Sequence, residues 1–253
     1  MIADRHLHTR FSTDSNEAPE NSIEKAISLG MKDIYITDHY DIDFPGGEFM
    51  FEPDRYFEEM TKLKEKYKGR INVHIGVEAG FGEKIADKYQ KLMSSYPWEY
   101  AIGSMHLIGE KDPYIRSLFD MDDRAYYRLC FETTLKGLKA CDGFDTLGHL
   151  DYPVRYGYGK DSDYRYEYFA DIVDEIFKEL IRRGIALEIN TAALRKGLKY
   201  PHPYPEALAR YKELGGKKLA LGSDAHEAKD VGYGFEEALE YIQKIGFTEE
   251  NFV

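Results

Sequence analysis

Short apolar runs alternate regularly with longer amphipathic stretches along this chain, and that alternation limits the folds it can adopt. We predict that the apolar runs are β-strands at residues 2–9, 33–37, 71–78, 100–104, 144–148, 185–190 and 218–223. A predicted helix follows each of them, beginning near residues 21, 53, 83, 123, 166, 205 and 235. Regular strand–helix alternation is typical of a parallel sheet. At 253 residues and without a linker, residues 1–253 are expected to form a single domain.

Polar residues gather where the predicted strands end. Six of the seven apolar runs give way to a histidine, aspartate or glutamate at their carboxyl end. An open parallel sheet usually concentrates its site at one switch point, whereas a closed barrel brings every strand end around a common centre. The sequence therefore favours a closed α/β barrel of seven strands.

The first run ends in His6-x-His8, and side chains two residues apart in a strand lie on the same face. Both histidines are therefore expected to bind one metal ion. A single histidine is more often a packing residue, but the whole set of strand-end residues predicts a metal site. The candidate ligands are His6, His8, Asp14, His39, Glu78, His106, His149, Asp224 and His226. Nitrogen and carboxylate donors suit zinc, manganese or iron, and nine ligands are enough for two or three divalent ions.

Composition restricts the partners. The chain has 34 basic and 46 acidic residues, a formal net charge of -12, which opposes extended contact with nucleic-acid phosphates. A small substrate is favoured. No run is apolar enough to cross a membrane or to resemble a secretory leader, so we expect a cytoplasmic protein. The oligomeric state stays open, and Cys130 and Cys141 lie too far apart along one predicted helix to form a disulfide.

Seven ordered motifs resemble those of the polymerase and histidinol phosphatase (PHP) superfamily, and most closely its histidinol-phosphatase family. The motifs are His6-x-His8, Asp14, Thr37-Asp38-His39, Gly76-Val77-Glu78, Ser104-Met105-His106, His149 and Ser223-Asp224-Ala225-His226. The resemblance implies a distorted seven-stranded (β/α)7 TIM-like barrel with three metals.

The resemblance also implies a ligand set for each ion. His6, His8, Glu78 and Asp224 would hold the first metal. Asp14, His39 and His226 would hold the second, and Glu78, His106 and His149 the third. Glu78 would thus bridge two ions. Asp14 departs from several relatives, which carry histidine at this position.

The implied reaction is hydrolysis of L-histidinol phosphate to L-histidinol and phosphate, a step of histidine biosynthesis. Two adjacent divalent ions can hold a hydroxide near neutral pH and direct it at phosphorus, while a third ion neutralises charge. Asp224 is the candidate proton acceptor, with a role as ligand alone as the alternative. A metal-bound water, His39 or His226 would protonate the leaving alkoxide.

A phosphate monoester also calls for fixed cations. Arg116, Arg155 and Arg195 follow the fourth, fifth and sixth predicted strands and are candidate phosphate ligands, with surface salt bridges as the alternative for each. Ser104 is a candidate hydroxyl donor. The loop at 40–44 and the tyrosine-rich stretch at 152–158 are candidates for binding the alcohol. We interpret His74 as a core residue and His202 as a loop residue, with a contact to the substrate as the alternative for His202.

Two other enzyme classes remain open at this stage. One is another PHP phosphoesterase, such as a nucleotide phosphatase, an exonuclease or a phosphotyrosine phosphatase. The other is an amidohydrolase-like enzyme that cleaves carbon–nitrogen bonds with fewer metals. A metal sensor without catalytic activity is the least favoured, because it does not require so many ligands around one cavity.

Overall fold

Seven parallel strands form one curled sheet in the computed structural model, which describes residues 2–162 and 164–253. They are β1 (Asp33–Ile36), β2 (His39–Tyr40), β3 (Asn72–Gly80), β4 (Tyr100–Ser104), β5 (Thr146–Leu147), β6 (Ala186–Asn190) and β7 (Leu219–Gly222). The strand order is β1-β3-β4-β5-β6-β7, and β2 pairs with β3 beyond the end of β1.

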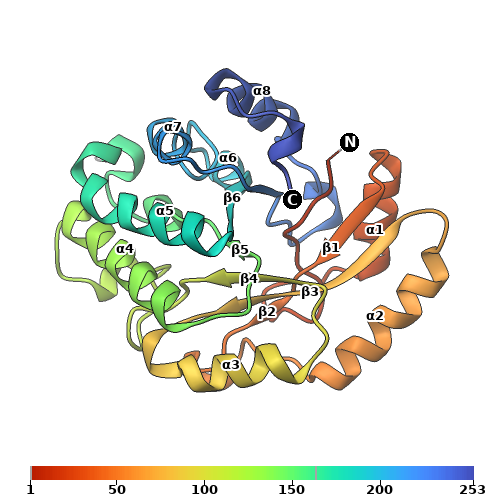
Figure 1. The fold of residues 1–253 in the computed structure, drawn as a ribbon. Helices are drawn as coiled ribbons and strands as arrows, with labels where there is room; N and C mark the ends of the chain where they lie inside the picture. Colours follow the sequence, from red (N-terminus) through yellow and green to blue (C-terminus); the bar gives the residue numbers. More distant parts are fainter. Residues whose placement is uncertain (1, 163) are drawn as a thin grey trace.

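Helices surround the sheet on its outer side (Figure 1). They are α1 (Pro19–Ser28), α2 (Pro53–Tyr67), α3 (Ala86–Ser95), α4 (Asp123–Ala140), α5 (Ala170–Arg183), α6 (Ala192–Arg195), α7 (Pro205–Glu213) and α8 (Phe235–Ile245). The predicted seven-stranded TIM-like α/β fold in a single domain is confirmed. The first helix begins at Pro19, two residues before its predicted start near residue 21, and the Asn21 side chain within it donates to Glu17.

The prediction of a regular strand at residues 2–9 is wrong, and β2 makes up the count of seven. This segment forms only isolated bridges, from Asp4 to Ile34 and from Leu7 to Ala225. The reason is that the Asp4 carboxylate accepts hydrogen bonds from backbone N–H groups, including that of Ser223 at 3.0 Å, where a strand would continue its ladder. The segment still connects the outer strands of the sheet, since Tyr35 N donates to Asp4 O and Arg5 N donates to Leu221 O, both at 3.0 Å.

The inside of the barrel changes character along its axis. Successive residues of a strand point to opposite faces, so Tyr100, Ile102 and Ser104 of β4 share the inner face. Tyr100 and Ile102 pack with Tyr35 in a small apolar cluster, whereas Ser104 donates to Glu78 at 2.7 Å. The amino end of the barrel is therefore filled by aromatic and aliphatic side chains, and the carboxyl end is polar.

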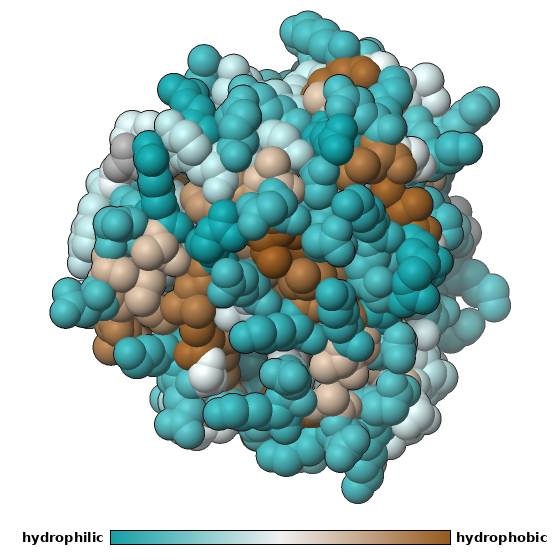
Figure 2. Space-filling model, turned by 60° about the vertical axis from the view of Figure 1, so that its left-hand side comes forward, coloured by the Kyte–Doolittle hydropathy of each residue, from teal (hydrophilic) through white to brown (hydrophobic). Residues whose placement is uncertain are grey.

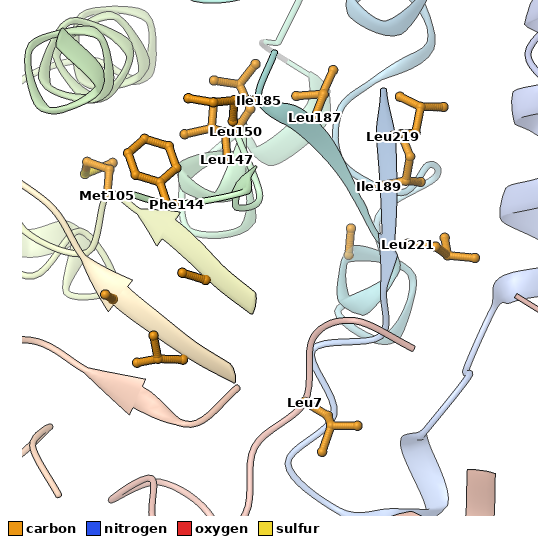
Figure 3. Packing of buried hydrophobic residues seen from close by; sticks show 14 of the residues in the cluster. Leu7, Met105, Phe144, Leu147, Leu150, Ile185, Leu187, Ile189, Leu219 and Leu221 are labelled. Atoms are coloured by element: carbon orange, nitrogen blue, oxygen red, sulfur yellow. The ribbon is translucent and has the colours of Figure 1, made fainter. Parts of the chain in front are cut away.

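The main hydrophobic core lies between the strands and the helices. Leu187, Ile189, Leu219 and Leu221 point outward from β6 and β7 (Figure 3) and are buried at 0% exposure. Fully burying one such side chain contributes about 1.5–3 kcal/mol. This outer core fixes the strands, and through them the polar residues at their carboxyl ends.

The two cysteines are buried and unpaired, as expected. No helix among the described residues combines the length and the apolar character needed to cross a bilayer. The face shown in Figure 2 is mostly hydrophilic, with small apolar patches separated by polar side chains.

Tyr56 offers a test of how the helical layer is joined to the sheet. Its buried hydroxyl donates to the carbonyl oxygens of Ile36 and Gly76, each at 3.0 Å, so it ties α2 to β1 and β3. We expect Tyr56→Phe to lower the free energy of unfolding by about 1–2 kcal/mol, because buried carbonyl oxygens lose their partner. Equilibrium denaturant unfolding measures this. Tyr233→Phe is the matched control, since Tyr233 is 44% exposed, and equal losses in both variants would contradict the expectation.

Candidate metal centre

Eight of the nine predicted ligands converge at the carboxyl ends of the strands. They form overlapping groups in which the potential ligand atoms lie within 4.8 Å of one another. Three groups lie near the centre: His6 with His8 and Glu78, His6 with His149 and Asp224, and Glu78 with His106 and His149. Two lie closer to the rim: His8 with His39 and His226, and His39 with Asp41 and His106. Asp14 is at the edge, where its Oδ2 lies 3.0 Å from Nε2 of His226.

Glu78 lies at the centre of the cluster and is fully buried near the end of β3. Its Oε2 lies 3.1 Å from His6 Nε2 and 3.0 Å from His39 Nδ1. Its Oε1 lies 3.1 Å from His106 Nε2 and 2.8 Å from His149 Nε2. The two oxygen atoms therefore face different groups of histidines.

The tight turn after β7 presents Asp224 to the same centre. Asp224 has a φ of 53°, an uncommon conformation for a residue other than glycine that aspartate tolerates better than most. Its backbone N donates to His6 O at 2.7 Å, and its Oδ1 lies 3.5 Å from His8 Nε2. The strained turn thus fixes Asp224 against the His6-x-His8 segment.

Several imidazoles are fixed by their outer nitrogen. His6 Nδ1 lies 2.5 Å from Glu188 Oε1, His8 Nδ1 lies 3.1 Å from Ser12 Oγ, and His106 Nδ1 lies 2.9 Å from Asp41 Oδ1. In each case Nε2 is left facing the cluster. A partner that binds one ring nitrogen and directs the other inward is typical of histidines that bind metals.

The charges of the cluster are strongly coupled. Burial would raise the pKa of Glu78, but the imidazoles of His6, His106 and His39 hold it well below its ordinary value. Burial also acts to raise the pKa of Asp224, and His6 and His8 outweigh it in the same way. Both carboxylates are therefore ionised at neutral pH and available to a cation.

The pKa values of His6 and His8 are shifted in opposite directions by their surroundings. Burial together with the neighbouring His39 and His226 lowers the pKa of His8 well below its ordinary value. Burial also acts to lower the pKa of His6, but the carboxylates of Glu78, Glu188 and Asp224 raise it well above that value. The cluster thus contains imidazoles that repel added protons next to imidazoles whose positive charge stabilises carboxylates.

The donor set fits divalent cations. Glu78 Oε2 and His39 Nδ1 are buried and make no hydrogen bond within the described residues, although they lie 3.0 Å apart. A cation between them would satisfy both atoms. The ring of His8 also stacks on those of His39 and His226, with centroids 4.1 and 4.2 Å apart, so the ring nitrogens crowd one region. Imidazole and carboxylate donors without thiolates suit zinc, manganese or iron.

The comparisons with known proteins agree with this geometry. A PHP domain model matches residues 4–192. This chain belongs to the PHP family. The "Probable histidinol-phosphatase" of Clostridium acetobutylicum is 36% identical over 96% of this chain and 93% of that protein. The histidinol-phosphatase of Lactococcus lactis is 32% identical over 97% of this chain and 92% of that protein.

A solved structure is similar to this PHP chain over nearly its full length. It is the crystal structure of histidinol phosphate phosphatase from Lactococcus lactis complexed with zinc, L-histidinol and phosphate. The TM-score is 0.89 at 31% identity, covering 98% of this chain and 94% of that chain. The predicted membership in the histidinol-phosphatase family is confirmed.

The predicted phosphate ligands of the PHP chain occupy different surroundings. Arg155 reaches the cluster, where its Nη1 lies 3.3 Å from Asp224 Oδ2. Arg195 donates to the carbonyl oxygens of Ser223 and Asp224, both at 2.7 Å, and so supports the turn after β7. The Ser104 hydroxyl donates a hydrogen bond to Glu78.

Arg116 lies apart from the cluster in its described contacts. Its guanidinium donates to Asp123 Oδ1 and to the carbonyl oxygens of Phe119 and Met121, and it stacks on the ring of Tyr126. These contacts fix the loop before α4. A role in binding phosphate stays a prediction for this residue.

Sequence reasoning missed Glu188, which lies on β6 behind the ligands. Its Oε1 faces His6 Nδ1, and its Oε2 accepts a hydrogen bond from His149 N at 2.6 Å. The signal was a carboxylate inside an apolar strand, since Glu188 lies between Leu187 and Ile189 and is 1% exposed. A charge in such a place needs a fixed partner.

The two remaining histidines also lie outside the cluster. His74 is half-buried near the amino end of the barrel and bonds Asp33 at 2.9 Å, so it is not a fully buried core residue. His202 lies in the loop between α6 and α7, as predicted, and is fully buried there.

Glu188→Gln tests the support behind the cluster. The change keeps the size of the side chain and removes the charge opposite His6 Nδ1. We expect the affinity for zinc to fall by about 10–100-fold, as is typical when the partner behind a metal-binding histidine is lost. Competition with a chromophoric chelator measures the affinity. Glu213→Gln is the control, because the Glu213 side chain is 66% exposed, and unchanged zinc affinity in Glu188→Gln would contradict the role of Glu188.

Proposed function

We propose that this PHP protein is a metal-dependent histidinol-phosphatase, which hydrolyses L-histidinol phosphate to L-histidinol and phosphate in the cytoplasm. The observation that carries the proposal is the match to the Lactococcus lactis structure, whose ligands are zinc, L-histidinol and phosphate. A cluster rich in histidine and carboxylate at the expected strand ends supports it. The net charge of -12 supports a small phosphate monoester over nucleic acid as substrate.

We propose that the cluster holds two or three divalent ions. His6, His8, Glu78 and Asp224 would bind the first, Asp14, His39 and His226 the second, and Glu78, His106 and His149 the third. The separate partners of the two Glu78 oxygen atoms support its role as a bridge. Asp14 is partly exposed, but its 3.0 Å contact with His226 supports its role as a metal ligand.

Divalent ions in such a site lower the pKa of water and offset the negative charge of phosphoryl oxygens. The protein's own contribution is to orient the substrate and to move protons. Asp224 is ionised and points into the cluster, which suits it to accept a proton or to act as a ligand alone. His39 and His226 lie near the rim, with side chains 13% and 29% exposed, and are the candidate donors to the leaving alkoxide.

The phosphoryl group requires fixed cations, and Arg155 is the best placed of the candidates. Its guanidinium is buried beside Asp224, where it can reach an oxygen of a substrate in the cluster. Arg195 and Ser104 are proposed to support the same subsite through Asp224 and Glu78.

A cavity of about 660 Å³ opens beside the cluster and is a candidate site for the alcohol. Its lining carries four carboxylates and two lysines, so acidic groups are in excess; they are Asp41, Asp43, Glu83, Glu110, Lys84 and Lys136. The amine and imidazole of histidinol carry or accept positive charge, and carboxylates stabilise both. The charge of this cavity supports an aminated alcohol over an uncharged one.

A steady-state comparison of substrates tests the proposed function. We expect zinc- or manganese-loaded protein to release phosphate from L-histidinol phosphate with a kcat/KM at least about a hundredfold above that for nucleoside monophosphates or phosphotyrosine. A site that binds one substrate through buried polar contacts can discriminate against other substrates by a factor of this size. Phosphate release is followed with a coupled assay. A preference for either competitor would assign the protein to another PHP phosphoesterase class.

Removal of the central carboxylates should abolish this activity. We expect Glu78→Ala and Asp224→Ala each to lower kcat/KM about a thousandfold or more, since metal ions contribute several kcal/mol to the transition state. Circular dichroism verifies the fold. Glu213→Ala is the matched control, and full activity in either cluster variant would refute the proposed site.

Chelation provides an independent measurement. Dialysis against a strong chelator should abolish phosphate release, and reconstitution should restore it with two or three ions per chain by elemental analysis. A single ion per chain together with no binding of phosphate would favour an amidohydrolase-like enzyme.

A further inference from the structure

His202 is a buried histidine that the ligand cluster does not use. It lies between α6 and α7 and is 0% exposed. Its backbone is fixed to Asn190 at the carboxyl end of β6, because Asn190 N donates to His202 O at 2.8 Å and His202 N donates to Asn190 O at 2.9 Å. The imidazole is thus held at the same edge of the barrel as the cluster.

The two ring nitrogens of His202 face groups of opposite character. Nδ1 lies 2.8 Å from Asp151 Oδ1, and Nε2 lies 3.1 Å from Arg155 Nε. The Nε–H of arginine can only donate, so His202 Nε2 must be the acceptor and the ring proton must be on Nδ1, facing the carboxylate. Burial lowers the pKa of His202, which keeps the ring in this neutral form.

Asp151 is itself fixed. It is 0% exposed, two residues beyond His149, and its Oδ2 accepts a hydrogen bond from Tyr204 N at 3.0 Å. Oδ2 therefore has a hydrogen-bond donor, while Oδ1 lies in close contact with His202 Nδ1, the only ring nitrogen of His202 that can carry the proton. The carboxylate holds the loop after β5 against the loop that carries His202.

The chain of contacts ends at the guanidinium of Arg155. Besides the bond from Nε–H to His202, Nη2 donates to Asn190 Oδ1 at 2.7 Å and Nη1 donates to Asp224 Oδ2 at 3.3 Å. An arginine has five N–H donors, so these three bonds leave two for another acceptor. The three bonds also fix the plane of the guanidinium beside the cluster.

We propose that Asp151 and His202 are positioning residues, which hold Arg155 in the orientation that presents its free N–H donors to the substrate phosphoryl group. The proposal rests on the proposed function, because it takes a phosphate monoester as the ligand.

The proposal has a physical basis in the competition for Arg155. An arginine beside a carboxylate prefers a bidentate ion pair, and the nearest carboxylate of the cluster is Asp224. The Nε–H donates to His202 Nε2 and one N–H of Nη2 donates to the amide oxygen of Asn190, so Asp224 is bonded through Nη1 alone. Without the His202 acceptor the guanidinium is free to turn onto Asp224, where it would no longer meet the phosphoryl group.

Asp151→Asn is the most conservative test. Tyr204 N requires an oxygen, so the new NH2 group faces His202 Nδ1 and moves the ring proton to Nε2, as a similar change does in a catalytic triad. Two donors, His202 Nε2–H and Arg155 Nε–H, then oppose each other. We expect KM and the inhibition constant of inorganic phosphate to rise roughly tenfold, the size of one lost hydrogen bond to a charged group, with kcat changed less than about threefold.

A pair of substitutions at His202 separates the two nitrogens. A glutamine carbonyl can replace the acceptor at Nε2, whereas an asparagine places its amide near Nδ1 and leaves Arg155 without an acceptor. We expect His202→Asn to raise the phosphate inhibition constant roughly tenfold and His202→Gln to stay within about threefold of the parent protein. His74→Asn, at the other end of the barrel, is the matched control and should leave the constant unchanged.

The double-mutant cycle with Arg155→Lys decides whether the effect passes through Arg155. In that background we expect Asp151→Asn and His202→Asn to have no further effect on phosphate binding, because coupled residues are not additive. Additive effects, or equal losses in His202→Gln and His202→Asn, would overturn the proposal. If His202→Asn does not fold, Asp151→Asn supplies the same test with almost no change in volume.

Calorimetric titration of inorganic phosphate into the metal-loaded protein separates this proposal from the proposed function. Phosphate binding that is weakened in Asp151→Asn supports the positioning role even if L-histidinol phosphate is not hydrolysed. Unchanged phosphate binding in Asp151→Asn and His202→Asn overturns the positioning role even if L-histidinol phosphate is the substrate.

Discussion

The buried carboxylate of Glu78 is the constraint on which the carboxyl end of this barrel depends. An ionised carboxylate without partners would cost several kcal/mol to bury, and Glu78 is 0% exposed. The register of the sheet supplies its partners, since His39 of β2 lies directly opposite Glu78 of β3. The carboxyl ends of the strands must therefore lie at the same height along the barrel axis. The short strand β2 pairs with β3 at this height and so places the His39 imidazole beside the Glu78 carboxylate.

The interior of the same barrel also needs apolar side chains to fill it. The apolar interior and the charged cluster occupy different ends of the barrel axis. Tyr35, Tyr100 and Ile102 fill the amino end, while Glu78 and Glu188 lie toward the carboxyl end. The separation follows from strand alternation, because residues two positions apart share the inner face. A strand such as β4 can therefore place an aromatic ring below and a hydroxyl group above without interrupting its hydrogen bonds.

Strand-end reasoning was enough to predict the fold and to bring eight potential ligands together, because the carboxyl ends of parallel strands converge whatever the details of the loops. It did not predict which loop residues support them. Asp41 belongs to the loop predicted to bind the alcohol, and its carboxylate also lies 2.9 Å from His106 Nδ1, a contact that the local pattern does not indicate. Asp4 interrupts the first predicted strand through bonds to residues more than two hundred positions away. Such contacts are fixed by tertiary structure, and no local pattern encodes them.

The charged residues behind the cluster show why the remaining roles were hidden. Glu188 and His202 each lie in a segment whose local pattern has an ordinary explanation, a buried strand and a loop between prolines. They differ from ordinary buried residues because each contacts two different segments of the chain through two polar atoms. Glu188 contacts His6 and the backbone N of His149. His202 contacts Asp151 and Arg155. A buried polar group with two fixed partners has only one orientation, and it passes that orientation to the residue it contacts. The geometry of the cluster is thus determined as much by these residues as by the histidines that the sequence reveals.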